Sequence, residues 1–213
     1  MAQDWRAGLT HHLEERCIAW MNLIEPGAVR NNAGERLSDV DILWRGEKVD
    51  FQFSGNFAKW GDFRADLVSC YTDGPTDPAG TSMLTATIAR EADDPQCPSL
   101  THLLSRHIRI KKFGKIGQTG PEAPDRLVIF FYNGQAARTG QPDLIYSAGI
   151  TELRHFIAGN WRHLAQSRRI LFNHKSALGD QYGSAFVALD VRNLLAQGVG
   201  CDMTGNGAVP ESG

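Results

Sequence analysis

The densest group of residues that could do chemistry lies between residues 38 and 54, in the stretch SDVDILWRGEKVDFQFS. It contains Asp39, Asp41 and Asp50, with Gln52 two residues further on. Side chains of a β-strand alternate between two faces, so Asp39 and Asp41 share a face, as do Asp50 and Gln52. Carboxylates brought together repel each other unless a cation lies between them. This pattern predicts a site for Mg²⁺, completed by water and a phosphate, that activates water for phosphodiester cleavage.

A β-hairpin is expected to position these side chains. The apolar residues that alternate along it are Val40, Ile42 and Trp44, and then Val49, Phe51 and Phe53. Gly46-Glu47 separates the two runs and predicts the turn. Before the hairpin, apolar residues recur at helical spacing from Leu9 to Ile24, and Pro26-Gly27 ends that pattern. The sequence therefore predicts a helix followed by two antiparallel strands.

In this order of elements, the hairpin resembles the PD-(D/E)XK nuclease-like superfamily. There, an acid on one strand is followed, after a tight turn, by an acid, one spacer and a lysine on the next strand. A preceding helix often supplies another acid. Asp41 matches the first acid, Asp50 the second, and Gln52 stands at the lysine position. Glu14, beside the apolar stripe of the helix, matches the additional acid, whereas Glu15 faces away from that stripe.

The resemblance covers about residues 9 to 54 and implies a restriction-endonuclease-like fold that cleaves nucleic acid. It implies that Asp41 and Asp50 hold Mg²⁺ or Mn²⁺, that Glu14 assists and that Gln52 orients water. A glutamine cannot neutralise charge as a lysine does. Either Lys48 or Lys59 substitutes from nearby, or catalysis is weak or absent.

Two other interpretations remain open. A polymerase-β-like nucleotidyltransferase has a Gly-rich turn, an Asp-x-Asp strand and a third acid on a neighbouring strand. Pro26-Gly27-Ala28, Asp39, Asp41 and Asp66 are similar to that pattern. Alternatively, the chain is a non-catalytic binding or inhibitor protein on a nuclease-like scaffold, for which Gln52 is the indication.

Basic residues gather in two stretches, although the whole chain has a formal net charge of −2. Such local positive charge is typical of proteins that bind a nucleic-acid backbone. Solvated helix faces explain the same residues. The predicted nucleic-acid-binding residues are Arg106, Arg109, Lys111, Lys112, Lys115, Arg162, Arg168 and Arg169.

Composition limits the remaining possibilities. A chain of 213 residues that is 42% hydrophobic can bury one ordinary core. The four cysteines show no CxxC spacing and the seven histidines no HExxH spacing, which makes a zinc enzyme improbable. No run is apolar enough to span a membrane and no export signal is evident, so we expect a cytoplasmic protein. Nucleic acid is the expected partner, a membrane is not, and a homodimer is left open.

The sequence predicts one α+β domain over residues 1–197, with a mixed central sheet flanked by helices, and a flexible C-terminal tail over 198–213. Residues 126–132 are the most apolar run and predict a buried central strand. We expect strands at 60–71 and 184–191 and helices at 99–108, at 153–164 and near 194–195. Residues 82–89 fit a further strand, and residues 111–124 fit a mobile connection.

Overall fold

Apolar runs separated by short turns fold into two β-sheets. The structure, a computed structural model, describes residues 5–31, 40–54, 61–71, 78–132, 142–177 and 180–204. Within these residues the protein is α+β, with five helices and two sheets. The chain divides into two compact units: unit 1 is Met1–Gly61, Thr119–Ile150 and Leu195–Gly213, and unit 2 is Asp62–Gln118 and Thr151–Leu194.

A six-stranded mixed sheet forms unit 1. Its only parallel pair within the described residues is β3 with β6, and its other neighbouring pairs are antiparallel. The mixed sheet expected from the sequence is therefore present. The strands, in spatial order, are β1 (Val29–Arg30), β2 (Ile42–Trp44), β3 (Glu47–Ser54), β6 (Arg126–Phe131), β7 (Leu144–Gly149) and β10 (Cys201–Asp202).

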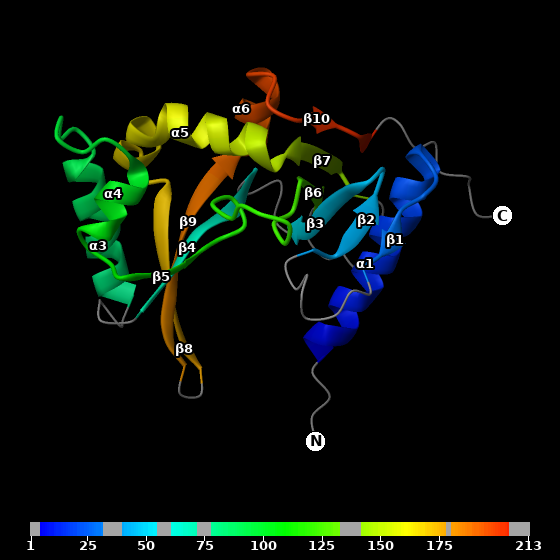
Figure 1. Cartoon of the computed structure of the whole chain (residues 1–213), viewed down its shortest axis with the longest axis horizontal. Helices are drawn as coiled ribbons and strands as arrows, with labels where there is room; N and C mark the ends of the chain where they lie inside the picture. The colour runs from blue at the N-terminus through cyan, green and yellow to red at the C-terminus, as the bar shows by residue number, and fades with distance from the viewer. Residues whose placement is uncertain are drawn as a thin grey trace. The chain divides into compact units, whose positions relative to one another are not determined.

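The core of unit 1 lies between this sheet and the helix α1 (Trp5–Ile24), which runs beside β1–β3 (Figure 1). Cys17, Trp20 and Met21 of α1 belong to the same buried cluster as Val49 and Phe51 of β3. Residues 127–131 of β6 are all buried, as expected of a central strand with both faces covered. The predicted helix, hairpin and central strand are confirmed.

Unit 2 contains a four-stranded antiparallel sheet. The strands, in spatial order, are β5 (Ile110–Phe113), β4 (Asp62–Tyr71), β9 (Asp180–Asp190) and β8 (Ile170–Ala177). The helices α3 (Pro78–Glu91) and α4 (Leu100–Ser105) belong to the same unit, and α3 contacts β8 (Figure 1). Two helices, α5 (Ile150–Gln166) and α6 (Val191–Ala196), each begin in one unit and continue into the other.

The strand expected at residues 82–89 is instead part of the helix α3, so that prediction is wrong. Its content of Thr and Ile favours a strand, but Pro78 begins the helix, a position where proline fits well. Thr85 and Ile88 of this helix are buried and lie three residues apart, on one face. Burial of this helical stripe overrides the local β-propensity.

Two segments expected to be flexible are partly ordered. Within residues 111–124, β5 extends to Phe113, and Gly114 and Ile116 are buried. Within the predicted tail, Cys201–Asp202 form β10 and pair with β7. The backbone N–H and C=O groups of these residues complete hydrogen bonds of the sheets, which polarity and glycine content alone do not reveal. Residues 205–213 lie outside the described residues, and the single domain over 1–197 stays a prediction.

No helix among the described residues is both long and apolar enough to cross a membrane.

Candidate active site

The β2–β3 hairpin carries the predicted acids, and its turn determines how they are arranged. Arg45 and Gly46 both adopt positive φ angles, 56° and 77°, as the central residues of a two-residue hairpin turn with right-handed strand twist do. The turn pairs Trp44 with Glu47 and Ile42 with Val49. Since Val49 and Phe51 face the α1 core, Asp50 and Gln52 point to the other face of β3.

Asp50 is fully buried, with 0% of its surface exposed. The Nε2 group of Gln52 donates a hydrogen bond to Asp50 Oδ2 at 3.2 Å, which confirms that the two side chains share a face. On β6 the register partners of Asp50 and Gln52 are Leu127 and Ile129, both buried. A carboxylate buried among apolar side chains loses hydration, a common feature of functional sites.

Asp41 lies immediately before β2, so strand alternation does not determine its direction. Its backbone N–H donates to Val49 O at 3.0 Å. Its carboxylate turns toward β3 and accepts a hydrogen bond from the Phe51 N–H at 2.8 Å. The Asp41 carboxylate therefore reaches the residue that follows Asp50. Asp39, the other acid expected on this strand, lies outside the described residues.

The acids of α1 are engaged by β1. Arg30 forms ion pairs with Glu14 and, at 2.7 Å, with Glu15. The Glu14 side chain is 15% exposed and that of Glu15 is 55% exposed, so Glu14 is the acid beside the apolar stripe, as predicted. Arg30 was not among the predicted site residues, and only the pairing of β1 beside α1 brings it to these acids.

Cys17 is a second residue that the sequence did not identify. Burial raises the pKa of its thiol well above the usual value, and the charges of Asp41 and Glu14 raise it further. Both carboxylates therefore act on one thiol at the face between α1 and the hairpin. The signal in the sequence was the spacing of Glu14 and Cys17, three residues apart on a helix.

The two lysines considered as substitutes for Gln52 do not fill that role in the described part of the chain. Lys48 shares the strand face of Asp50, but its Nζ donates to Pro121 O at 2.8 Å and lies 3.8 Å from Asp125 Oδ1. Lys59 lies outside the described residues. Gln52 itself stands at the lysine position, and its amide contacts Asp50.

The two hairpin acids are of the donor type that Mg²⁺ prefers. Mg²⁺ commonly binds one or two carboxylates and completes its octahedral shell with water and phosphate. Asp41 and Asp50 supply two carboxylates, each accepting a hydrogen bond from a neutral N–H group. Among the described residues, no group of three or more His, Cys, Asp or Glu side chains is arranged to hold a metal ion.

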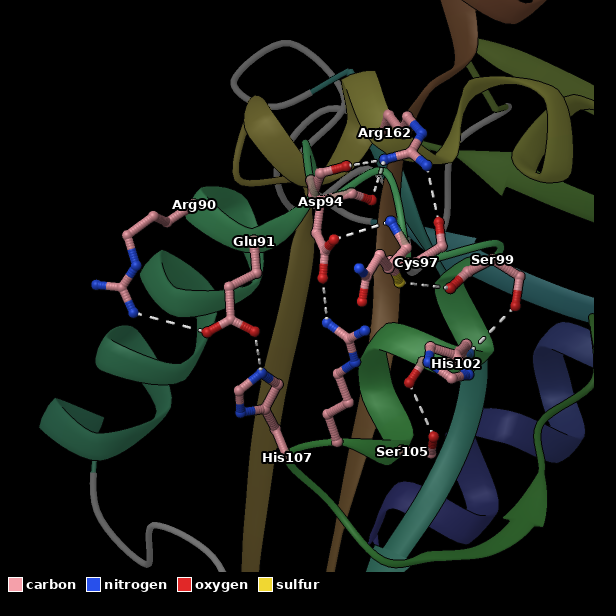
Figure 2. Close-up of polar contacts among 12 residues, drawn as sticks. Arg90, Glu91, Asp94, Cys97, Ser99, His102, Ser105, His107 and Arg162 are labelled. Carbon is pink, nitrogen blue, oxygen red and sulfur yellow. Dashed lines mark hydrogen bonds and ion pairs between the residues drawn. The ribbon is translucent and has the colours of Figure 1, made fainter.

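Three of the eight predicted nucleic-acid-binding residues instead hold unit 2 together. Arg106 pairs with Asp94 at 2.6 Å, and Arg169 pairs with Asp62 at 3.0 Å. Arg162 donates to Ala92 O, to Asp94 O at 3.2 Å and to Cys97 O at 2.7 Å, so it holds the loop between α3 and α4 (Figure 2).

Further polar contacts lie near this loop. Glu91 Oε2 lies 2.8 Å from His107 Nε2, which joins the end of α3 to the segment after α4 (Figure 2). Hydrogen bonding from Arg106 lowers the pKa of Asp94.

The remaining predicted nucleic-acid-binding residues are at the surface of unit 2. Four of them, Arg109, Lys111, Lys112 and Arg168, are exposed, and Lys115 is half-buried.

The nucleotidyltransferase pattern requires its third acid on a strand beside the Asp-x-Asp strand. Asp66 lies on β4, whose neighbours are β5 and β9 in the four-stranded sheet. The neighbours of β2 are β1 and β3. Asp66 is therefore not on a strand beside β2, whereas β3, which is beside β2, carries Asp50.

The geometry of the hairpin is the basis for assigning a function, since comparisons with protein-family models, with curated proteins and with solved structures find no match to this chain.

Proposed function

We propose that unit 1 is a PD-(D/E)XK-like, restriction-endonuclease-like core that cleaves phosphodiester bonds of nucleic acid with Mg²⁺ or Mn²⁺. The order of its elements supports this proposal. The helix α1 precedes a hairpin in which Asp41 stands before β2, a two-residue turn follows, and Asp50 and Gln52 occupy β3. This order matches the pattern that the sequence resembles.

The observation that carries the proposal is a buried acid of the hairpin, Asp50, with a half-buried acid, Asp41, beside the same strand. Asp50 is fully buried, and the Asp41 carboxylate reaches the backbone N–H of the next residue, Phe51. In the proposed site these two carboxylates hold the metal. When bound, the ion would activate water and offset the charge that develops on the scissile phosphate. Gln52 orients a water or a phosphate oxygen, whereas Glu14 pairs with Arg30 on the α1 side of the hairpin.

Cleavage assays test the proposal directly. Single-stranded and duplex DNA and RNA are incubated with Mg²⁺ or Mn²⁺ and with wild type, Asp41→Ala, Asp50→Ala or Asp50→Asn. Loss of cleavage in these variants, with cleavage retained in Glu122→Gln, is the expected result. Glu122 is an exposed acid of the same unit, so this variant controls for the loss of one negative charge. Cleavage that survives Asp50→Asn would refute the proposal.

One observation favours a second candidate, a non-catalytic binding protein on the same scaffold. The amide of Gln52 donates to Asp50, where a lysine would supply positive charge. This candidate predicts nucleic-acid or protein binding that Asp41→Ala and Asp50→Ala leave unchanged, without metal-dependent cleavage. In the same assays, incorporation of a nucleoside triphosphate without cleavage would support the transferase instead.

Gln52→Lys separates the two candidates further. In a nuclease core, a lysine at this position adds the charge that Gln52 lacks and should preserve or raise cleavage. In a binding protein the same substitution creates no cleavage activity.

A cytoplasmic location and a homodimer stay predictions, which cell fractionation and sedimentation would test.

A further inference from the structure

The strand β5 of unit 2 ends in an exposed aromatic side chain beside several cations. β5 is the first strand in the order β5-β4-β9-β8, so it lies at the edge of this sheet as described. Its last residue, Phe113, is 46% exposed. An exposed aromatic ring offers a face on which another flat group can stack.

The turn after Phe113 is held rigidly against β4. Gly114 donates its N–H to Leu67 O at 2.8 Å. A Cβ atom at Gly114 would lie 2.5 Å from Asp66 O, so only glycine permits this approach. The N–H groups of Gly117 and Gln118 donate to Gly114 O at 2.8 and 2.9 Å, which closes the turn.

A helix of the same unit holds the far side of this turn. Arg154 of α5 donates from Nε to Ile116 O and from Nη2 to Gln118 O, each at 2.8 Å. Ile116 between these contacts is buried. The turn over residues 114–118 is therefore bound by β4 and by α5.

This turn sets the position of the Phe113 side chain. A Cβ atom at Gly117 would lie 3.0 Å from Phe113 Cδ1 and 3.3 Å from Cγ, so the absence of a side chain lets the backbone approach the ring. Backbone thus supports one side of the Phe113 ring, while nearly half of the residue remains accessible. A supported ring with accessible surface loses little conformational entropy when a flat group stacks on it.

The charges around Phe113 indicate what kind of group would stack. Arg109, Lys111 and Lys112 are exposed and Lys115 is half-buried, whereas Asp66 of β4 is the acid beside the turn. These four basic residues lie within seven positions, 109–115, of a chain whose formal net charge is −2. An aromatic ring among cations is the combination that binds unpaired nucleotides, whose bases stack while their phosphates are neutralised.

We propose that β5 and its turn bind single-stranded nucleic acid, with a base stacked on Phe113 and phosphates held by Lys111 and Lys112. A paired base in a duplex does not present its face to such a ring, so the surface selects unpaired nucleotides. This inference deepens the proposed function, on which it rests for the choice of nucleic acid as partner, by assigning the substrate class.

Fluorescence anisotropy with a labelled 20-nucleotide single strand and its duplex tests the inference. EDTA in the buffer removes divalent metal and separates binding from cleavage. Phe113→Leu keeps an apolar side chain but removes stacking, and it should weaken single-strand binding about tenfold while changing duplex binding less than twofold. Met83→Leu is the matched control, because Met83 is an apolar residue of the same unit that is 71% exposed.

The charge contribution is tested by salt dependence. Lys112→Gln should reduce the slope of log affinity against log salt by about 0.7 for the single strand. Arg90→Gln makes the same change of charge on α3 and should leave the slope unchanged. Gly117→Ala retains every cation but displaces the Phe113 ring, so it should weaken single-strand binding by about threefold or more. Thermal unfolding confirms that each variant is folded.

Several outcomes would overturn the inference. These are unchanged binding in Phe113→Leu, equal losses for single strand and duplex, or an Arg90→Gln effect as large as that of Lys112→Gln. Self-association through the β5 edge, lost in Phe113→Leu, would assign this surface to a second copy of the chain. Cleavage that is independent of Phe113 would refute this inference alone, whereas single-strand binding without any cleavage would refute the proposed nuclease alone.

Discussion

Two acids of the unit 1 hairpin and two acids of unit 2 accept different kinds of hydrogen bond. In unit 1, Asp50 is fully buried and accepts a hydrogen bond from the Gln52 amide, and Asp41 accepts one from a backbone N–H. In unit 2, Asp94 pairs with Arg106 at 2.6 Å and Asp62 pairs with Arg169 at 3.0 Å. These hairpin acids accept hydrogen bonds from neutral donors, whereas ion pairs join separate segments in unit 2 and also at Arg30 and Glu14 of unit 1.

This difference indicates different roles. A buried carboxylate costs stability because it loses hydration, and a folded protein tolerates that cost where the charge has a use. Ion pairs and arginine–carbonyl hydrogen bonds join elements of a fold. Changes to Asp41 and Asp50 of the hairpin should therefore reduce activity more than stability, and changes to the polar contacts of unit 2 should do the reverse.

The largest effect is expected at Asp50. Asp50→Asn removes the charge and keeps the shape, so metal-dependent cleavage should fall by about 100-fold or more. Removal of a buried charge should leave the melting temperature unchanged or raise it. Cleavage rates and thermal unfolding of the same preparation test both parts. A strongly destabilised variant would mean that Asp50 is a structural residue, like the acids of unit 2.

In unit 2, Arg162→Ala should cause the largest loss of stability. The guanidinium donates to three backbone carbonyls of the loop between α3 and α4, and its removal leaves them unsatisfied. We expect a loss of about 3 kcal/mol in the free energy of unfolding, measured with urea. Nucleic-acid affinity per folded molecule should remain unchanged. If the variant instead loses affinity for nucleic acid without losing stability, Arg162 binds nucleic acid, as the sequence predicts.

Gly114→Ala should destabilise unit 2 by about 2 kcal/mol, because the new Cβ would overlap Asp66 O. Gly159→Ala is the matched control: Gly159 lies within α5, and a Cβ there meets nothing within 4 Å. That variant should raise stability by about 0.5–1 kcal/mol, since alanine favours a helix. Equal effects at the two sites would show that the turn is not held as rigidly as its contacts indicate.

The smallest effect concerns pH. Hydrogen bonding from Arg106 lowers the pKa of Asp94, so this carboxylate stabilises the fold above its unfolded-state pKa of about 3.9. The contribution is lost as the pH falls through the lower, folded-state pKa. Arg106→Gln should be slightly less stable than wild type at pH 7, and the difference should vanish once Asp94 is protonated. A constant difference in urea unfolding across this range would contradict the assignment.

Local patterns predicted the elements that carry the site. The helical spacing from Leu9 to Ile24, the alternation of the hairpin and the apolar run at 126–132 each reflect a repeat within one element. Residues 144–149 and 170–177 form β7 and β8, which were not predicted. Short strands such as these are defined mainly by their pairing with distant segments.

The sequence by itself determined that the hairpin carries acids and an amide. It also determined that Asp50 and Gln52 share one face, because strand side chains alternate. Tertiary structure alone decided that Asp50 is buried, that Arg30 engages Glu14 and that Arg162 holds a loop. It also decided that the turn after β5 is held by β4 and Arg154. A residue's type and spacing determine what its side chain can do, but burial and long-range partners depend on which distant segments pack beside it.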